Sequence, residues 1–345
     1  MIYNFTLIER LLLSKDILPH PVLDSLNLVV AGRALQVAVK LKIFEIMRTR
    51  SMSLNDISDK AEISHNGAQV LLDCLAVMGY ISTYNGKYKL TSRAKKFLIS
   101  GSNYTLSNMV LFSENVFESL LKLDIYIKQG GPKLENLEVF TKHQWDIFNK
   151  AMAEIASLDV KEVIGKIPFS QDYKRLLDLG GSHGIHSIES CKKVHNLYAE
   201  IMDLKPTKAN AGRIIKENRM SKRVRFRAGD FLKDDLGGGH DVVLAFNVIH
   251  GLTTANNQKL ANKVFKSMNQ GGIYVILDQI KEARGKSDLA RLIPATMGVM
   301  LFNQSGGRTY SLVEVEKWME NAGFRKVEFK KLRNPGNGII IGHKA

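Results

Sequence analysis

The second half of this 345-residue chain alternates between strand and helix patterns, and this alternation limits the fold more than any other feature. From Arg175 onward, amphipathic segments separate short apolar runs, which include RLLDLG, LYAEIMDL, DVVLAFNV and GIYVILDQ. Strands that are joined through helices run parallel, because each helix returns the chain to the same edge of the sheet. We therefore predict a doubly wound α/β sheet, which binds ligands at the carboxyl ends of its strands.

The first hundred residues predict a different and mostly helical fold. Ser53 and Ser64 are suitable N-caps for two short helices, the second of which stops at Gly79. Asn85-Gly86 then separates two short alternating runs, which is a strong hairpin signal. Two helices and a hairpin form a winged-helix pattern. We divide the chain into a winged-helix dimerisation domain (1–100), a helical linker with pocket residues (101–168) and the α/β domain (169–345).

A winged helix and a net charge of +15 raise the question of a nucleic-acid partner. The excess charge is spread in proportion to length, with +5 in residues 1–100 and +10 in the remainder. The densest cluster, KRVRFR at 222–227, alternates like one solvated face of a strand. The second helix, NGAQVLLDCLAVM, has no Arg or Lys to read bases or contact phosphates. The sequence therefore disfavours nucleic acid and favours a dimerisation or lid role for this domain.

Other features bear on oligomeric state and location. The segment LVVAGRALQVAVKLKIFEIM is apolar nearly all round and requires burial, which predicts a homodimer. We expect no apolar run near the roughly 20 residues of a membrane span. Glu9 and Arg10 interrupt the N-terminal apolar stretch, so it does not resemble a signal peptide. The two cysteines lie far apart in sequence, which argues against a disulfide scaffold. We expect a cytoplasmic protein without a membrane partner.

A glycine loop, LLDLGGSHG, follows the first strand of the α/β region. Its spacing is GGxxG, whereas dinucleotide sites use GxGxxG. Asp178 precedes the loop, where a carboxylate would repel a pyrophosphate but suit the ammonium and sulfonium charges of S-adenosylmethionine. Asp203 ends the next strand and can bind ribose hydroxyls, a feature that NAD sites share. Asp230 follows the third strand and can accept a hydrogen bond from an adenine amino group.

At this point the chain resembles a known family. The motifs LLDLGGSHG, IMDLKPTKANA, RFRAGDFL, NVIHGLT, NQGGIYVILDQ and GGRTYSLVEVEKWMENAGF resemble those of small-molecule O-methyltransferases of the caffeic-acid and hydroxyindole type, in family order. The resemblance implies an S-adenosylmethionine-dependent enzyme of secondary metabolism, with an N-terminal winged-helix dimerisation domain and a small, aromatic acceptor. It implies that Gly180, Asp203, Asp230 and Phe231 bind the cofactor. The full candidate set is Asp178, Gly180, Gly181, Asp203, Leu204, Gly229, Asp230, Phe231, Phe246 and Asn247.

The resemblance also aligns His250 with the family's general base. The family usually reads His-Asp-Trp there, but this chain reads His250-Gly251-Leu252. Asp278 falls at the position of a Glu that orients the base, and we assign the position of a second supporting Glu to the uncharged Thr309. A neutral imidazole, with a pKa near ~6.5, can take the proton of a phenol, with a pKa near ~10, as attack develops. Asp278 would fix the imidazole tautomer from the other nitrogen.

Several alternatives stay open. A histidine after a strand is often structural, and the departures around His250 leave room for N- or C-methylation, or for a non-methylating use of the cofactor. A regulator that senses S-adenosylmethionine and binds DNA is a candidate of another class. His183 and His186 have metal-ligand spacing, but no third ligand is evident, so we expect no metal. Candidate pocket residues, for which core packing is an equally good interpretation, are Met152, Met297, Met300 and Phe302.

Overall fold

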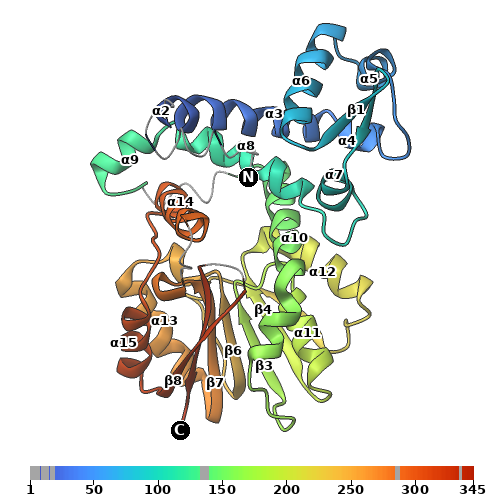
Figure 1. The fold of residues 1–345 in the computed structure, drawn as a ribbon. Helices are drawn as coiled ribbons and strands as arrows, with labels where there is room; N and C mark the ends of the chain where they lie inside the picture. The colour runs from blue at the N-terminus through green and yellow to red at the C-terminus, as the bar shows by residue number, and fades with distance from the viewer. Residues whose placement is uncertain (1–7, 9–14, 16–19, 133–139, 284–287, 334–335) are drawn as a thin grey trace. The chain divides into compact units, whose positions relative to one another are not determined.

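The structure is a computed structural model that describes residues 8, 15, 20–132, 140–283, 288–333 and 336–345. It divides into two compact units, Met1–Asn115 and Val116–Ala345, which we describe separately (Figure 1). The three-part division expected from the sequence stays a prediction.

The first unit contains the expected pair of helices and hairpin. Helix α5 (Leu54–Ala61) begins with a capping box, in which Ser53 and Asp56 bond each other's backbone N–H groups. Helix α6 (His65–Val77) begins at the Ser64 cap, and Gly79 follows it with a φ of 76°. Strands β1 (Ile81–Tyr84) and β2 (Lys87–Leu90) pair antiparallel across Asn85 and Gly86, which have φ values of 47° and 68°. These values identify the type I′ turn that the sequence predicts.

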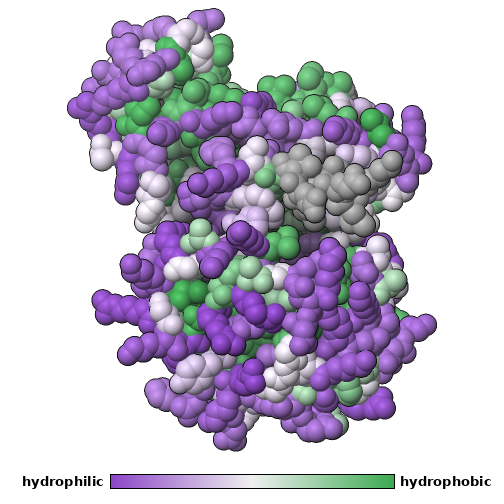
Figure 2. All heavy atoms as spheres, turned by 180° about the vertical axis from the view of Figure 1, so that it is seen from behind, coloured by the Kyte–Doolittle hydropathy of each residue, from purple (hydrophilic) through white to green (hydrophobic). Residues whose placement is uncertain are grey.

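The apolar segment of this unit forms one continuous helix from α2 (His20–Val22) through η1 (Leu23–Asn27) to α3 (Leu28–Lys40). Our expectation that no segment approaches a membrane span was wrong, because this 21-residue helix is long and apolar enough to cross one. Apolar helices of soluble proteins can have the same length and composition, so this helix is weak evidence for a membrane. Apolar side chains along the helix contribute to the green surface in Figure 2 and are exposed at Val22, Leu26, Leu28, Val29 and Val30.

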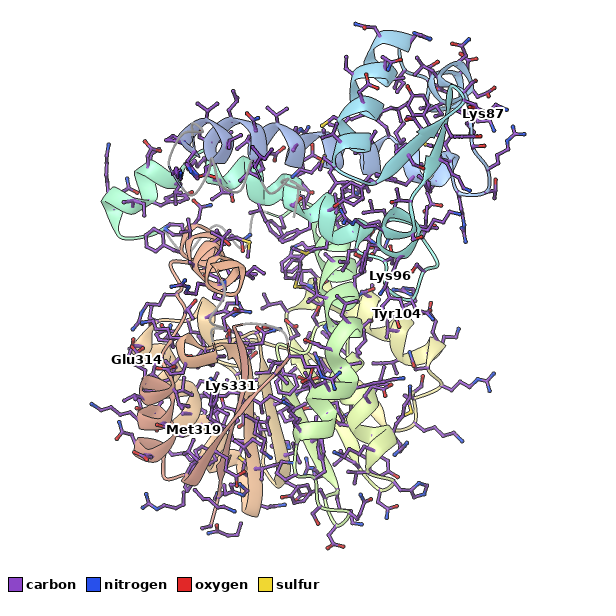
Figure 3. All side chains as sticks on the ribbon, in the orientation of Figure 1. Lys87, Lys96, Tyr104, Glu314, Met319 and Lys331 are labelled. Carbon is purple, nitrogen blue, oxygen red and sulfur yellow. The ribbon has the colours of Figure 1, made fainter. Side chains whose placement is uncertain are left out.

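Shorter helices complete the first unit and lead into the second. Lys96 places its ammonium group 4.6 Å from the centre of the Tyr104 ring, and the two side chains lie close together in Figure 3. Arg33 and Lys40 of α3 both contact Glu114 of α8, at 2.8 and 3.1 Å. These helices are α4 (Ile43–Ile46), α7 (Ser92–Phe97), α8 (Ser107–Leu120), which crosses the boundary between the units, and α9 (Leu123–Gln129).

The second unit is built on a seven-stranded sheet of order β5-β4-β3-β6-β7-β9-β8. The first five strands in this order run parallel, and β9 is antiparallel to both β7 and β8. This is the doubly wound α/β sheet that the strand and helix alternation predicts. The strands are β3 (Arg175–Leu179), β4 (Tyr198–Asp203), β5 (Val224–Ala228), β6 (His240–Phe246), β7 (Met268–Gln279), β8 (Arg325–Lys331) and β9 (Asn337–His343).

Helices pack against both faces of the sheet, because alternate strand residues are apolar on both sides (Figure 1). One face packs against α10 (Lys142–Lys166), α11 (Ile185–Lys193) and α12 (Lys208–Glu217). The other packs against α13 (Thr254–Ser267) and α15 (Leu312–Ala322). Helix α15 carries Glu314 in its first turn and the buried Met319 on its inner side (Figure 3). Helix α14 (Asp288–Ser305) contacts the turn that follows β6.

Candidate active site

The turn after β6 holds His250 in a short 3-10 helix, η4 (Ile249–Gly251). Three hydrogen bonds from residues outside η4 hold the backbone of this turn. The Asn257 side-chain amide donates to the carbonyl of Ile249 at 3.0 Å, and the Arg308 backbone N–H donates to the carbonyl of His250 at 3.0 Å. The Tyr310 hydroxyl donates to the carbonyl of Leu252 at 2.6 Å. The histidine therefore stands on a constrained turn and not on a free loop end.

His250 is paired with Asp278, the last buried residue of the neighbouring strand β7. Nδ1 of His250 lies 2.6 Å from Oδ1 of Asp278, and the His250 backbone N–H donates to Oδ2 at 3.3 Å. An ionised carboxylate only accepts hydrogen bonds, so the proton resides on Nδ1 and Nε2 has a free lone pair. The side chain of Asp278 is fully buried, whereas 20% of the His250 side chain is exposed. The structure therefore brings together the two side chains that the family resemblance pairs.

The glycine loop brings backbone close to the carboxyl ends of β3 and β6. Gly180 has a φ of 67°, and a Cβ there would lie 2.9 Å from the side chain of Val248. A Cβ at Gly181 would lie 2.5 Å from the carboxyl group of Asp178. Asp178 is 1% exposed and accepts a hydrogen bond from Ser187 at 2.7 Å. Burial raises the pKa of Asp178 to about 7. This carboxyl group thus supports the loop from beneath.

The two acids at the next strand ends accept hydrogen bonds from nearby backbone. Asp203 accepts from the N–H groups of Ser182 at 2.8 Å and Leu204 at 2.6 Å, and burial raises its pKa to about 6. Asp230 accepts from the N–H of Leu232 at 2.9 Å and contacts Lys233 at 3.1 Å. Burial acts to raise the pKa of Asp230, but these two partners outweigh it and lower the pKa. Both acids lie at the sheet edge that carries His250, as the sequence predicts.

His183 and His186 lie beside the glycine loop, with ring centres 5.5 Å apart. Burial lowers their pKa values to about 4 and about 3, so both are neutral near pH 7. The His186 ring packs edge-on against Phe246 at 4.9 Å, and its Nε2 is buried without a hydrogen-bond partner. Among the residues that the structure describes, no group of three or more His, Cys, Asp or Glu side chains could hold a metal ion.

Comparison with known proteins identifies the family. The model of the O-methyltransferase domain matches residues 119–325, and that of the O-methyltransferase dimerisation domain matches residues 23–100. The chain belongs to the O-methyltransferase family. This match confirms the predicted resemblance, the enzyme class and the expectation of S-adenosylmethionine as the cofactor.

Relatives of this chain carry the names of methyltransferases for oxygen, nitrogen and carbon. One is the 3-hydroxy-5-methyl-1-naphthoate 3-O-methyltransferase of Streptomyces sahachiroi, which is 23% identical over 91% of this chain and 92% of its own length. Another is the N,N-dimethyltransferase OxyT of Streptomyces rimosus, which is 24% identical over 91% and 93%. The L-tyrosine C(3)-methyltransferase of Streptomyces lavendulae is 22% identical over 91% and 90%.

Solved structures share the fold over the same length. Human N-acetylserotonin methyltransferase in complex with S-adenosylmethionine has a TM-score of 0.82, 19% identity and full coverage of both chains. PigF with S-adenosylhomocysteine has a TM-score of 0.82, 20% identity and coverage of 94% of this chain and 99% of its own. These similarities confirm the doubly wound sheet with its helical N-terminal region.

The remaining candidate residues occupy different surroundings. Thr309 is buried, and its hydroxyl has no hydrogen-bond partner and lies on the side of Gly298 of α14. It therefore does not support His250 or Asp278. The proposed pocket residues on α10 and α14 are all half-buried and are Met152, Met297, Met300 and Phe302. The other cofactor candidates at the carboxyl edge are Leu204, Gly229, Phe231, Phe246 and Asn247, of which Asn247 has a φ of 55°.

Sequence reasoning missed several residues that shape this site. Gly307 is the most constrained of them, because a Cβ there would lie 1.7 Å from the carbonyl oxygen of His250. Asn257 and Tyr310 hold the His250 turn, and Ser187 holds Asp178. Asn149 of α10 is buried and accepts a hydrogen bond from the Ser182 hydroxyl at 3.3 Å. Gly307 and Tyr310 lie in the GGRTYS motif, but that motif served only to support the resemblance, and only the spatial neighbours of these residues reveal their roles.

Proposed function

We propose that this enzyme transfers a methyl group from S-adenosylmethionine to a hydroxyl of a small aromatic molecule, with His250 as the general base. The observation that carries this proposal is the 2.6 Å contact between Nδ1 of His250 and the buried Asp278. It orients the imidazole and leaves Nε2 to accept a proton from an acceptor hydroxyl. General-base assistance of this kind contributes typically about 10²–10⁴-fold in rate.

The carboxyl edge of the sheet fits the cofactor. The loop glycines leave no room for side chains, so the bare backbone allows close approach to a ligand. We assign ribose binding to Asp203, and contact with the adenine to Asp230 with Phe231. We assign the methionine end to Gly180 and Gly181. We assign Asp178 an indirect role, through the glycine loop that it supports. The remaining candidates that line the cofactor site are Leu204, Gly229, Phe246 and Asn247.

The bound cofactor supplies an electrophilic methyl group, so the protein has to position the acceptor, exclude water and remove a proton. The fixed turn holds His250, which removes the proton, in one place, since backbone bonds at Ile249, His250 and Leu252 restrict its movement. We assign acceptor contacts to Met152 of α10 and to α14, through Met297, Met300 and Phe302. Their half-buried apolar side chains suit an aromatic ring.

Methylation of nitrogen or carbon is the second candidate. Relatives of similar identity carry the names N,N-dimethyltransferase and C(3)-methyltransferase, so the scaffold is not restricted to oxygen. A hydroxyl acceptor needs a base, whereas a neutral amine can attack before it loses its proton. The His250–Asp278 pair therefore favours the oxygen acceptor.

A transfer screen with isotope-labelled S-adenosylmethionine tests the proposal. The panel contains matched phenols, anilines and phenol ethers, and the product mass and fragmentation locate the methyl group. We expect label on the oxygen of at least one phenol and none on its ether. Label confined to anilines or to ring carbons would overturn O-methylation while leaving the family assignment intact.

We further propose a homodimer formed through the dimerisation domain, in the cytoplasm, without a membrane or nucleic-acid partner. The exposed valines of α3, Val29 at 44% and Val30 at 55%, support the dimer because they form an apolar surface on a domain of that family. We also propose three functional parts of the chain, namely the dimerisation domain (1–100), the linker with pocket residues (101–168) and the cofactor domain (169–345).

A further inference from the structure

A hollow of about 470 Å³ lies at the amino ends of the parallel strands, at the edge of the sheet opposite His250. Four strands contribute their first residue or a residue near their start, and the loop before β5 completes the wall. The side chains that matter for its chemistry are Arg175, Tyr198, Glu200, Lys222, Arg225 and His240.

The hollow exists because one part of the sheet has no helix over it. Glu200 of β4 and Arg225 of β5 are register partners and point away from the face that Ala199 and Ile201 present to the core. Residues 229–239, which connect β5 to β6, form turns and contain no helix. On the same face, α13 and α15 pack against β6 and β7 and do not extend over the start of β4 and β5. The edge of this face therefore stays open at the start of the strands.

The charges around the hollow do not cancel. Glu200 accepts from Arg225 at 2.7 Å and from Arg227 at 2.6 Å, so one acid serves two guanidinium groups. Arg223 is committed to the backbone, since its guanidinium donates to the carbonyls of Cys191 and His195 at 2.7 Å. The side chains of Arg175 and Lys222 form no hydrogen bond or ion pair with the described residues. Two cations are thus available to a bound anion.

Two further residues of the lining are His240 and Tyr198. His240 is 3% exposed and lines the hollow, and its Nε2 lies 2.9 Å from the carbonyl of Leu236. Nε2 therefore carries the proton, and the buried Nδ1 is an acceptor without a partner. Tyr198 is 57% exposed at the rim, where its ring offers a flat apolar surface. Cations and an aromatic ring together suit a ligand with phosphate and ring portions.

We propose that this hollow binds a small phosphorylated molecule of the nucleotide class, separately from the methyl-transfer site. Arg175 and Lys222 contact its phosphate oxygens, and Tyr198 packs against its base. The volume of about 470 Å³ fits a mononucleotide and is far too small for a duplex. The inference does not depend on the proposed acceptor or on His250.

Calorimetric titration of the full chain with ADP and with inorganic pyrophosphate, at fixed ionic strength, tests the proposal. We expect both probes to bind, and Arg175→Gln combined with Lys222→Gln to weaken both by about 10-fold or more. Tyr198→Ala should weaken ADP by roughly 10-fold and leave pyrophosphate unchanged. The matched control is Lys259→Gln with Lys317→Gln, which removes the same charge from exposed positions on α13 and α15.

Each of several results would overturn the proposal. If neither probe gives binding heat, the proposed site does not exist. If the control variant binds both probes as weakly as the Arg175 and Lys222 variant, the binding is general charge attraction. An unchanged ADP affinity in Tyr198→Ala would exclude the nucleotide class. Displacement of ADP by a single-stranded oligonucleotide that binds more tightly would assign the surface to nucleic acid instead.

Discussion

The two edges of the sheet use polar side chains in opposite ways. At the carboxyl edge, Asp178, Asp203 and Asp278 are all buried or nearly so, and each accepts at least one hydrogen bond from a nearby group. At the amino edge, Arg175 and Lys222 line a hollow without a partner among the described residues. The comparison shows that one edge is rigidly arranged before any ligand binds, whereas the other keeps its charge available. Fixed dipoles suit catalysis, and free cations suit the capture of anions.

Asp278→Asn should cause the largest loss at the carboxyl edge. The amide retains the size of the carboxyl group but lacks its charge, so it no longer stabilises the imidazolium that forms when His250 accepts a proton. We expect the single-turnover rate of methyl transfer to fall by about 10³-fold, within the range for general-base catalysis. Cofactor affinity, measured by calorimetry, should change less than about twofold, and the exposed Asp172→Asn is the control. A rate equal to that of the wild type would show that the pair has no catalytic role.

Gly307→Ala tests whether the His250 turn has to be held in place. The new Cβ would lie 1.7 Å from the His250 carbonyl oxygen, so the turn must move. A displacement near 1 Å can cost about 10²-fold in rate, and we expect a loss of that order at saturating cofactor. Gly212→Ala on α12 is the matched control, because its Cβ would meet nothing within 4 Å. Similar rates in the two variants would refute the positioning role of the turn.

His186→Gln tests the energetic consequence of burying neutral groups at this edge. Burial lowers the pKa of His186 to about 3, below the ~6.5 of an unfolded chain. Its contribution to stability is complete above pH 6.5 and is lost as the pH falls toward 3. Between pH 8 and pH 5, the free energy of unfolding of the wild type should fall relative to the variant by about 2 kcal/mol.

Urea unfolding at pH 8 and pH 5 measures the free energy of unfolding of both proteins. Asp178 and Asp203 have the opposite pH dependence, but they are present in both proteins, so their contributions cancel in the difference. The exposed His195→Gln should show no such change. An equal pH dependence in all three proteins would mean that His186 is not buried as a neutral group.

The smallest effect is expected at the amino edge. Arg175→Gln with Lys222→Gln should change the rate of methyl transfer by less than about twofold in the absence of a nucleotide, because these residues lie at the edge opposite His250. A substantial loss of rate with unchanged cofactor affinity would show that the amino edge takes part in methyl transfer, which contradicts the comparison of the two edges.

Most of the carboxyl edge could be predicted from sequence. Strand periodicity located Asp203, Asp230 and Asp278 at strand ends, since parallel strands align these ends along one edge. The pairing of His250 with Asp278 came from the family resemblance, and the 2.6 Å contact confirms that the two side chains meet. The turn at Asn85-Gly86 was predictable for a local reason, because only residues tolerant of positive φ fit it.

Other features depend on contacts between distant segments. Gly307 lies 57 positions after His250, and no local pattern reveals that its α-carbon lies against that carbonyl. Thr309 was placed by the resemblance at the position of a supporting Glu that this chain lacks, and its buried hydroxyl lies near Gly298 without a hydrogen-bond partner. The cluster at 222–227 was interpreted as a solvated strand face, which its alternation supports. The hollow beside it arises from the missing helix between β5 and β6.

The rate of methyl transfer by His250→Ala, measured in a single turnover with saturating labelled S-adenosylmethionine, tests the central claim most directly. The account predicts a fall of about 10²–10⁴-fold, with calorimetric affinity for the cofactor within about twofold of the wild-type value. A rate that matches the wild type would contradict it, because the acceptor would then lose its proton without the imidazole that Asp278 orients.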